Sequence, residues 1–156
     1  MKVMRVRGQA GFTLVEAMVV VAIVAIMAAV GMPNFIRYVD NNRLRAAGRD
    51  VSSDISDTKS RAVAQNAAYR ITFNVSGNSY TIESPADTVV QTKSLAGYGS
   101  GVRLQSANFG GAAFINFQTR GTTDLGTVVL RNNRTSSTVT ITSNITGKAY
   151  VTYSLQ

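Results

Sequence analysis

The apolar segment near the N-terminus constrains the fold of this chain more than any other feature. It runs from Phe12 to Met32, 21 residues, and an α-helix of that length is about 30 Å long, the thickness of a bilayer's hydrocarbon core. Ten of its residues are Val, Ile, Leu or Phe, and one is an acid, Glu16. The ten contribute roughly −3 to −6 kcal/mol to insertion, whereas one acid costs about 2.5 to 3.5 kcal/mol. The segment is therefore predicted to enter a membrane despite Glu16.

Two ordinary explanations of this segment are incomplete. A secretory signal peptide would have the basic start seen in Lys2, Arg5 and Arg7, but the apolar run is long, contains an acid and has no A-x-A cleavage site. A plain membrane anchor accounts for the length. It does not account for the sharp boundary between a polar stretch that ends at Gly11 and an apolar run that opens with Phe12.

The boundary itself carries a motif. The stretch GFTLVE, residues 11–16, resembles the class III signal sequences of type IV pilins and of the pseudopilins of type II secretion. The resemblance implies that prepilin peptidase cuts between Gly11 and Phe12 and that the new N-terminus of Phe12 is methylated. It also implies that Glu16 pairs with the N-terminal amine of a neighbouring subunit and sets the assembly register. The alternative, that Glu16 interacts only with its own helix N-terminus, stays open.

The helical pattern continues beyond the apolar run. Pro33 stands where pilin helices of this family carry a proline, and it predicts a kink because proline removes a backbone donor and crowds the preceding turn. Apolar residues then recur at helical spacing and predict a face that packs on a sheet: Leu44, Ala47, Val51, Ile55, Ala62 and Val63. The other face is predicted to be solvated, with an ion pair between Asp57 and Arg61, and it carries Arg45, Arg49, Asp50, Asp54, Asp57 and Arg61.

After Gln65 the sequence changes to short alternating segments separated by Gly and Asn. Residues 69–75 and 79–84 flank Ser-Gly-Asn and predict a hairpin. Further strands are predicted at 89–95, 102–105, 113–118, 127–130, 139–143 and 149–153. The glycine cluster at 97–101 lacks the context of a nucleotide-binding loop and is interpreted as a mobile surface connection. The predicted fold class is α+β, a long N-terminal helix packed on an antiparallel β domain.

The domain organisation follows from these boundaries. We expect a leader at 1–11, a transmembrane and assembly half of the helix at 12–33, an amphipathic half at 34–66 and a C-terminal β domain at 67–156. Within the pilin-like group, residues 53–82, 115–130 and 140–153 resemble the GspH/FimT type of minor pilin and pseudopilin. The absence of a cysteine pair also favours a minor pilin over a main filament subunit.

The charge leaves one alternative function open. The chain has 16 basic and 8 acidic side chains, and three of the basic ones lie in the predicted leader. Some GspH/FimT members carry Gly-Arg-x-Arg in the last hairpin, a stretch linked to DNA uptake, where this chain has GKAY at 147–150. Arg131, Arg134 and Lys148 are candidate DNA contacts if the last strands bring them together.

Catalysis is not expected. The chain has no Cys and no His, and no nucleophile elbow or phosphate-binding glycine loop, so neither a cofactor nor a metal site is predicted. The predicted function is that of a structural minor pilin or pseudopilin in or at the tip of a type IV pilus or type II secretion pseudopilus. The alternative is a pilus-associated DNA receptor. The expected partners are other pilins, prepilin peptidase and the bacterial inner membrane, crossed once, with the C-terminal domain in the periplasm before assembly.

Overall fold

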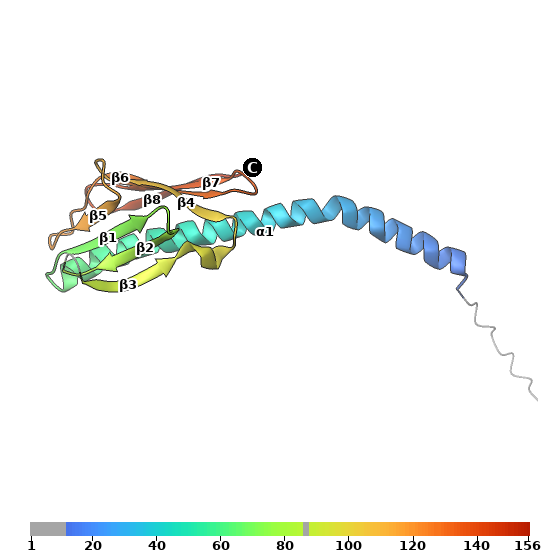
Figure 1. The fold of residues 1–156 in the computed structure, drawn as a ribbon, viewed down its shortest axis with the longest axis horizontal. Coiled ribbons are helices and arrows are strands. Elements are labelled where there is room, and N and C mark those ends of the chain that lie inside the picture. Colours follow the sequence, from blue (N-terminus) through green and yellow to red (C-terminus); the bar gives the residue numbers. More distant parts are fainter. Residues whose placement is uncertain (1–11, 86–87) are drawn as a thin grey trace, which may run out of the picture. The chain divides into compact units, whose positions relative to one another are not determined.

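The computed structural model describes residues 12–85 and 88–156 (Figure 1). The predicted leader, including Gly11, lies outside the described residues. The chain divides after Ile36 into two compact units. One long helix, α1 (Leu14–Ala64), supplies the described part of the first unit and the beginning of the second.

Two four-stranded sheets follow α1 in the second unit, and all their strand pairs are antiparallel. The first sheet has the order β3-β2-β1-β5 and consists of β1 (Tyr69–Asn74), β2 (Ser79–Glu83), β3 (Val89–Ser94) and β5 (Phe114–Phe117). The second has the order β4-β6-β7-β8 and consists of β4 (Val102–Asn108), β6 (Gly126–Asn132), β7 (Thr138–Ser143) and β8 (Ala149–Ser154). A short 3-10 helix, η1 (Leu95–Tyr98), joins β3 to β4. The predicted α+β fold class is confirmed.

The strands form where side chains alternate between core and surface. In β1, Tyr69, Ile71 and Phe73 are buried while the residues between them are partly exposed. The predicted hairpin is present, with Asn74 paired to Ser79 across the turn. This alternation fixes the register, because a slip of one residue would turn the apolar side chains out of the core.

The C-terminal part of α1 packs on both sheets, as Figure 1 shows. Most of the predicted apolar face is buried, but Val63 is not, since 48% of its surface is exposed. The helix approaches β7 closely at Gly48, where an added Cβ would stand 2.6 Å from Val139 Cγ1. A larger residue at this position would push the helix away from the sheet.

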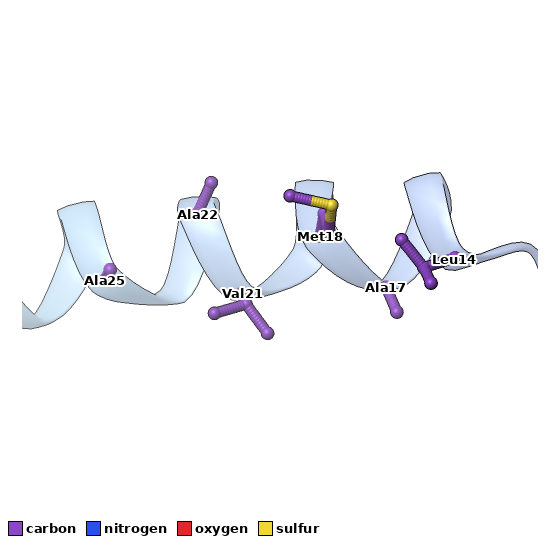
Figure 2. A pocket seen from close by; sticks show the side chains of 6 residues that line it. All are labelled: Leu14, Ala17, Met18, Val21, Ala22 and Ala25. Atoms are coloured by element: carbon purple, nitrogen blue, oxygen red, sulfur yellow. The ribbon is translucent and has the colours of Figure 1, made fainter.

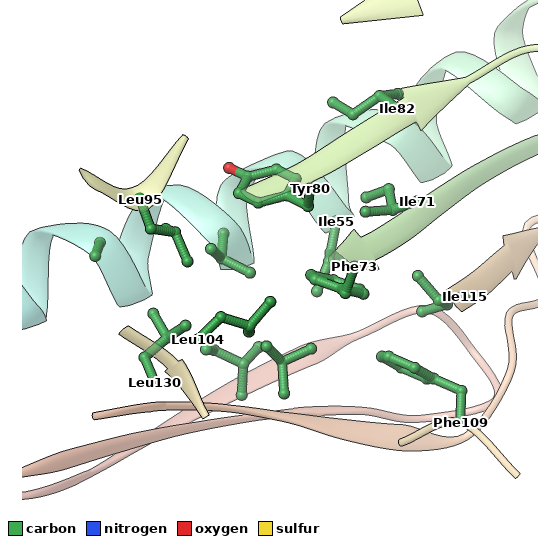
Figure 3. Packing of buried hydrophobic residues seen from close by; sticks show 14 of the residues in the cluster. Ile55, Ile71, Phe73, Tyr80, Ile82, Leu95, Leu104, Phe109, Ile115 and Leu130 are labelled. Atoms are coloured by element: carbon green, nitrogen blue, oxygen red, sulfur yellow. The ribbon is translucent and has the colours of Figure 1, made fainter. Parts of the chain in front are cut away.

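One apolar core joins α1 to the two sheets. Figure 3 shows Ile55 of α1 beside Ile71 and Phe73 of the first sheet, with Leu104 and Leu130 of the second sheet facing them. All five side chains are at most 4% exposed. The helix therefore completes the core of the β domain instead of only connecting it to the N-terminal segment.

The face of α1 that the sequence predicted to be solvated takes part in this packing. Asp54 is buried, and it accepts hydrogen bonds from the Tyr80 hydroxyl at 2.5 Å and from Lys93 Nζ at 2.7 Å. Asp50 accepts a hydrogen bond from the Tyr98 hydroxyl. The prediction of a solvated face was wrong at Asp54, because β2 places Tyr80 over the helix and satisfies the buried carboxylate. Asp50 is exposed as predicted, although it is bound to Tyr98 of η1. Among the ion pairs of the described residues, none joins Asp57 to Arg61.

The glycine cluster at 97–101 is also docked more firmly than predicted. Leu95, just before it, is buried, and Tyr98 is tied to Asp50. Gly101 is buried too, and its carbonyl accepts a hydrogen bond from the Asn133 backbone N–H at 3.0 Å. The segment is therefore a packed connection between the sheets instead of a purely superficial one.

Candidate functional site

The N-terminal half of α1 exposes apolar side chains on every face. Phe12, Leu14 and Phe35 are 66–77% exposed, and the most apolar 18-residue window of the helix has a mean hydropathy of 2.6 with no part of it buried. Within the described residues this is one helix that is long and apolar enough to cross a membrane, although a signal sequence would satisfy the same criteria. A helix that is apolar all round needs a nonpolar environment, either lipid or other helices.

The start of this helix is capped. Helix α1 begins at Leu14, and Thr13 Oγ1 accepts a hydrogen bond from the Glu16 backbone N–H at 3.2 Å. Thr13 and Glu16 have the Thr-x-x-Glu spacing of a capping box, in which the first side chain satisfies one of the free N–H groups of the first turn. The sequence analysis missed the role of Thr13, although this spacing could have indicated it.

Glu16 lies in the first helical turn and is exposed. In the part of the chain that the structure describes, its carboxylate has neither a hydrogen-bond partner nor an ion-pair partner. A carboxylate near a helix N-terminus is favoured by the helix dipole, but an unpaired one in a nonpolar environment is costly. Glu16 is thus placed to accept a cation from outside the described chain.

One stripe of the apolar helix has the spacing of a helix-packing seam. Leu14, Met18, Val21 and Ala25 follow one another at intervals of four, three and four residues. Figure 2 shows these side chains along the helix, together with Ala17 and Ala22, where they line a shallow apolar hollow. The short side chains of the alanines leave a depression between the larger side chains, and a neighbouring helix can pack into it.

Pro33 lies inside α1, which is helical on both sides of it. Its ring nitrogen carries no hydrogen, so the carbonyl four residues earlier loses its usual helical partner. The kink at Pro33 stays a prediction.

The three candidate DNA contacts do not form one patch. Arg131 and Arg134 lie at or beyond the end of β6, whereas Lys148 lies just before β8. Thr138, the first residue of β7, pairs with Arg131 of β6, and Ser143, the last residue of β7, pairs with Ala149 of β8. Arg134 and Lys148 are therefore separated by the length of β7, about 17 Å. The expectation that the last strands bring them together was wrong.

Arg134 has an internal role instead. Its NH1 lies 3.8 Å from Oδ2 of Asp40, a buried acid of α1, and its NH2 donates a hydrogen bond to Ser100 Oγ at 3.2 Å. Arg43 approaches the other oxygen of Asp40 at 3.4 Å. Arg134 therefore holds the β6–β7 turn against α1, although 57% of its side chain remains exposed.

Lys148 lies in a different polar hollow. The hollow is lined by Ser56, Lys59, Ser60, Thr146, Gly147, Lys148 and Ala149. Lys59 Nζ donates to the Thr146 carbonyl at 2.7 Å, and Lys148 Nζ lies 5.1 Å from the centre of the Tyr150 ring. Two lysines therefore share this end of the last hairpin, one of them bound to the backbone and the other over an aromatic face.

The tyrosines that bind the helix have altered acidity. Burial, followed by the hydrogen bond to Asp50, raises the pKa of Tyr98 to about 12. Burial, followed by the hydrogen bond to Asp54, raises the pKa of Tyr80 further in the same direction. Both hydroxyls therefore remain protonated donors at neutral pH and hold the carboxylates of α1 in place.

The comparisons with known proteins agree with this geometry. Residues 6–32 match the prokaryotic N-terminal methylation motif. No curated protein matches the chain. Among solved structures, the type IV minor pilin FimU of Pseudomonas aeruginosa is similar with a TM-score of 0.59 at 15% identity, over 74% of this chain and 92% of FimU. The minor pseudopilin EpsH of the type 2 secretion system of Vibrio cholerae has a TM-score of 0.59 at 11% identity, over 71% of this chain and 97% of EpsH.

The chain thus carries a prokaryotic N-terminal methylation motif at the start of its long apolar helix. The structure as a whole has the α+β fold that FimU and EpsH share.

Proposed function

We propose that this chain is a minor pilin or pseudopilin, a structural subunit that is cleaved, methylated, held in the inner membrane and then built into, or placed at the tip of, a filament. Two observations together carry the proposal: residues 6–32 match a methylation motif, and the described residues leave the apolar helix that follows unburied. Such a helix needs lipid before assembly and neighbouring helices after it. The role is mechanical and requires no catalysis.

Cleavage between Gly11 and Phe12 by prepilin peptidase is the first step of the proposal. It removes the leader and leaves a new amine, which is methylated, at Phe12, only two residues before α1 begins. The amine then lies close to the membrane or filament interior, where an uncompensated charge is expensive. Other pilins, prepilin peptidase and the membrane are the proposed partners.

Glu16 supplies the countercharge in this proposal. Its carboxylate is exposed in the first turn and unpaired within the described residues, so it is free to meet the Phe12 amine of a neighbouring subunit. A buried ion pair contributes little net stability, but the loss of one partner is strongly destabilising. The pair would therefore select one register between adjacent helices.

The membrane-resident state places residues 12–32 across the inner membrane once and the β domain in the periplasm. The two machines that use such subunits, type IV pili and type II secretion systems, are each represented among the similar structures. The DNA-receptor alternative gains no support, because Arg131 and Arg134 lie at one end of β7 and Lys148 at the other, so the three candidate cations do not form one patch.

The test is the intact mass and N-terminal sequence of the membrane-extracted chain, from cells with and without prepilin peptidase. We expect a chain that begins at methylated Phe12 only when the peptidase is present. Gly11→Val should block cleavage, whereas Gly8→Val, a matched change inside the leader, should not. A chain that keeps Met1 in the presence of the peptidase, or that is cut near Gly31, would contradict the proposal.

A further inference from the structure

A polar hollow lies at the start of the second unit, where the chain leaves the apolar half of α1. It is lined by Arg37, Arg134, Thr135, Ser136 and Gln156 and has a volume of about 250 Å³. A water molecule occupies about 30 Å³ in the liquid, so the hollow has room for a phosphate group.

The hollow presents two cations, of which the fold has already oriented one, Arg134. Arg134 is positioned by Ser100 and Asp40, and its backbone N–H donates to Asn132 Oδ1 at 2.9 Å. Only two of its guanidinium nitrogens are engaged, and 57% of the side chain is exposed. Arg37 is exposed and makes no recorded hydrogen bond or ion pair within the described residues.

The acids nearby do not cancel this charge. Asp40 is buried behind the hollow and is shared between Arg43 and Arg134. Arg37 is the third arginine here, and it lines the hollow together with Arg134. Gln156, the last residue of the chain, lines the hollow too, and its terminal carboxylate is a second negative charge, so the arginines exceed the carboxylates by one. One oxygen of Gln156 accepts a hydrogen bond from Asn41 Nδ2 at 3.2 Å.

One uncharged donor, the hydroxyl of Ser136, also lines the hollow. Ser136 is exposed at the tip of the β6–β7 turn with a left-handed φ of 58°, and its hydroxyl has no recorded partner among the described residues. Thr135 is fixed by its hydrogen bond to Asn41 Oδ1 at 3.1 Å. Guanidinium groups beside a hydroxyl are the donors that bind phosphate in proteins, because the planar fork matches two phosphate oxygens.

The place of the hollow along the chain suggests the source of the phosphate. Arg37 follows Met32 by five residues, which span about 7.5 Å as helix. The headgroup layer beyond the hydrocarbon core is about 5 to 8 Å deep on each side. If the apolar segment ends at Met32 in the membrane, Arg37 lies at the depth of the lipid phosphates.

We propose that this hollow binds the phosphate of an anionic phospholipid headgroup while the subunit resides in the membrane. This inference rests on the membrane-resident state of the proposed function. Anionic lipids attract basic residues near a membrane surface, and the hollow adds oriented hydrogen bonds to that attraction. The lipid would leave when the subunit passes into a filament.

The test uses the full chain in a neutral detergent, titrated with short-chain phosphatidylglycerol, short-chain phosphatidylcholine or inorganic phosphate, with bound ligands counted by native mass spectrometry. We expect phosphatidylglycerol to bind more tightly than either other ligand. Arg37→Gln should weaken its binding about tenfold, the effect of losing one charge-assisted hydrogen bond of about 1.5 kcal/mol. Arg134→Gln should do the same, with its melting temperature measured because Asp40 loses a partner.

The matched control is Arg120→Gln, an exposed arginine in the turn after β5 that makes the same change of charge outside the hollow. Equal losses of affinity in the Arg37 and Arg120 variants, or equal affinity for the two lipids, would overturn the proposal.

Two other outcomes would reassign the site to a different ligand. Binding of inorganic phosphate as tight as that of phosphatidylglycerol would assign the site to a free anion. Tighter binding of duplex DNA, lost in Arg37→Gln, would assign it to nucleic acid. Flotation of the chain with neutral vesicles tests membrane residence separately.

Discussion

At the residue scale, two acids of α1 have hydrogen-bond partners in the β domain that the helical pattern of the sequence did not predict. Asp50 and Asp54 stand at positions that helical spacing alone assigned to solvent, yet each accepts a hydrogen bond from a tyrosine of the β domain. A helix period tells which residues share a face, but it does not tell how wide a face the sheets will cover. The tyrosines that do so lie 26 and 48 residues further along the chain, so local sequence could not identify them.

These tyrosines predict a loss of stability at high pH. The folded pKa of Tyr98 is about 12 against a usual value of 10.0, so the contribution of its hydroxyl is complete below pH 10 and is lost as the pH rises to 12. Over that range the unfolded state loses its proton first, and the free energy of unfolding falls. Tyr98→Phe should make this fall shallower, as measured by chemical denaturation at several pH values.

Tyr153→Phe is the matched control, because Tyr153 is 39% exposed and has no recorded side-chain hydrogen bond among the described residues. Its pH profile between 10 and 12 should follow that of the natural chain. If Tyr98→Phe also follows it, the hydrogen bond to Asp50 does not control the alkaline sensitivity.

At the start of α1 we expect Glu16 to act in filament assembly and Thr13 to act in capping the helix, so that substitutions of the two residues have different effects. Glu16→Gln removes the charge and should greatly reduce incorporation into filaments, while cleavage and membrane extraction remain normal. Thr13→Val removes the acceptor of the Glu16 backbone N–H and should cost about 0.5 to 2 kcal/mol of helix stability with a smaller effect on incorporation. Sheared-filament fractions measure incorporation. Equal losses in the two variants would mean that Glu16 serves the cap and not the register.

At the element scale, the sequence predicted every described strand to within a few residues, because alternation and Gly or Asn punctuation are local properties. It did not predict how the strands divide into two sheets, because that depends on partners distant in sequence. Asn78 illustrates the difference. The sequence predicts only that Asn78 lies in a turn. In the structure its buried side chain donates to the Val102 carbonyl at 3.0 Å and accepts from the Leu104 N–H at 2.7 Å, so it joins the two sheets.

The pairing of β4 with β6 depends on a small residue at the start of β6. A Cβ at Gly126 would stand 2.3 Å from the backbone oxygen of Asn108 and 2.4 Å from the ring of Phe109. Gly126→Ala should therefore lower the free energy of unfolding by about 1 to 3 kcal/mol, measured by denaturant titration. At Gly97 an added Cβ meets nothing within 4 Å, so Gly97→Ala should change stability little. Similar losses in both variants would contradict the assigned packing.

At the scale of the whole molecule, the boundary between units differs from the boundary between helix and strands. The sequence suggested a β domain at 67–156, but Leu44, Val51 and Ile55 of α1 belong to its core. Residues 37–156 should therefore give a folded monomer without detergent, with a cooperative thermal transition. Residues 67–156 should not fold, because the face of both sheets that α1 covers would be exposed. Circular dichroism and size-exclusion chromatography distinguish these outcomes, and a folded 67–156 fragment would contradict the assignment.

The spacing of the three buried or tyrosine-bound acids has a mechanical consequence. Asp40, Asp50 and Asp54 tie α1 to three separate segments, the β6–β7 turn, η1 and the first sheet. A tensile load along the helix would be shared among these ties and the apolar core between them, so that failure requires shearing of many contacts at once. A load applied to one strand end would instead open pairs one after another. The attachment of the β domain is thus suited to a helix that bears traction.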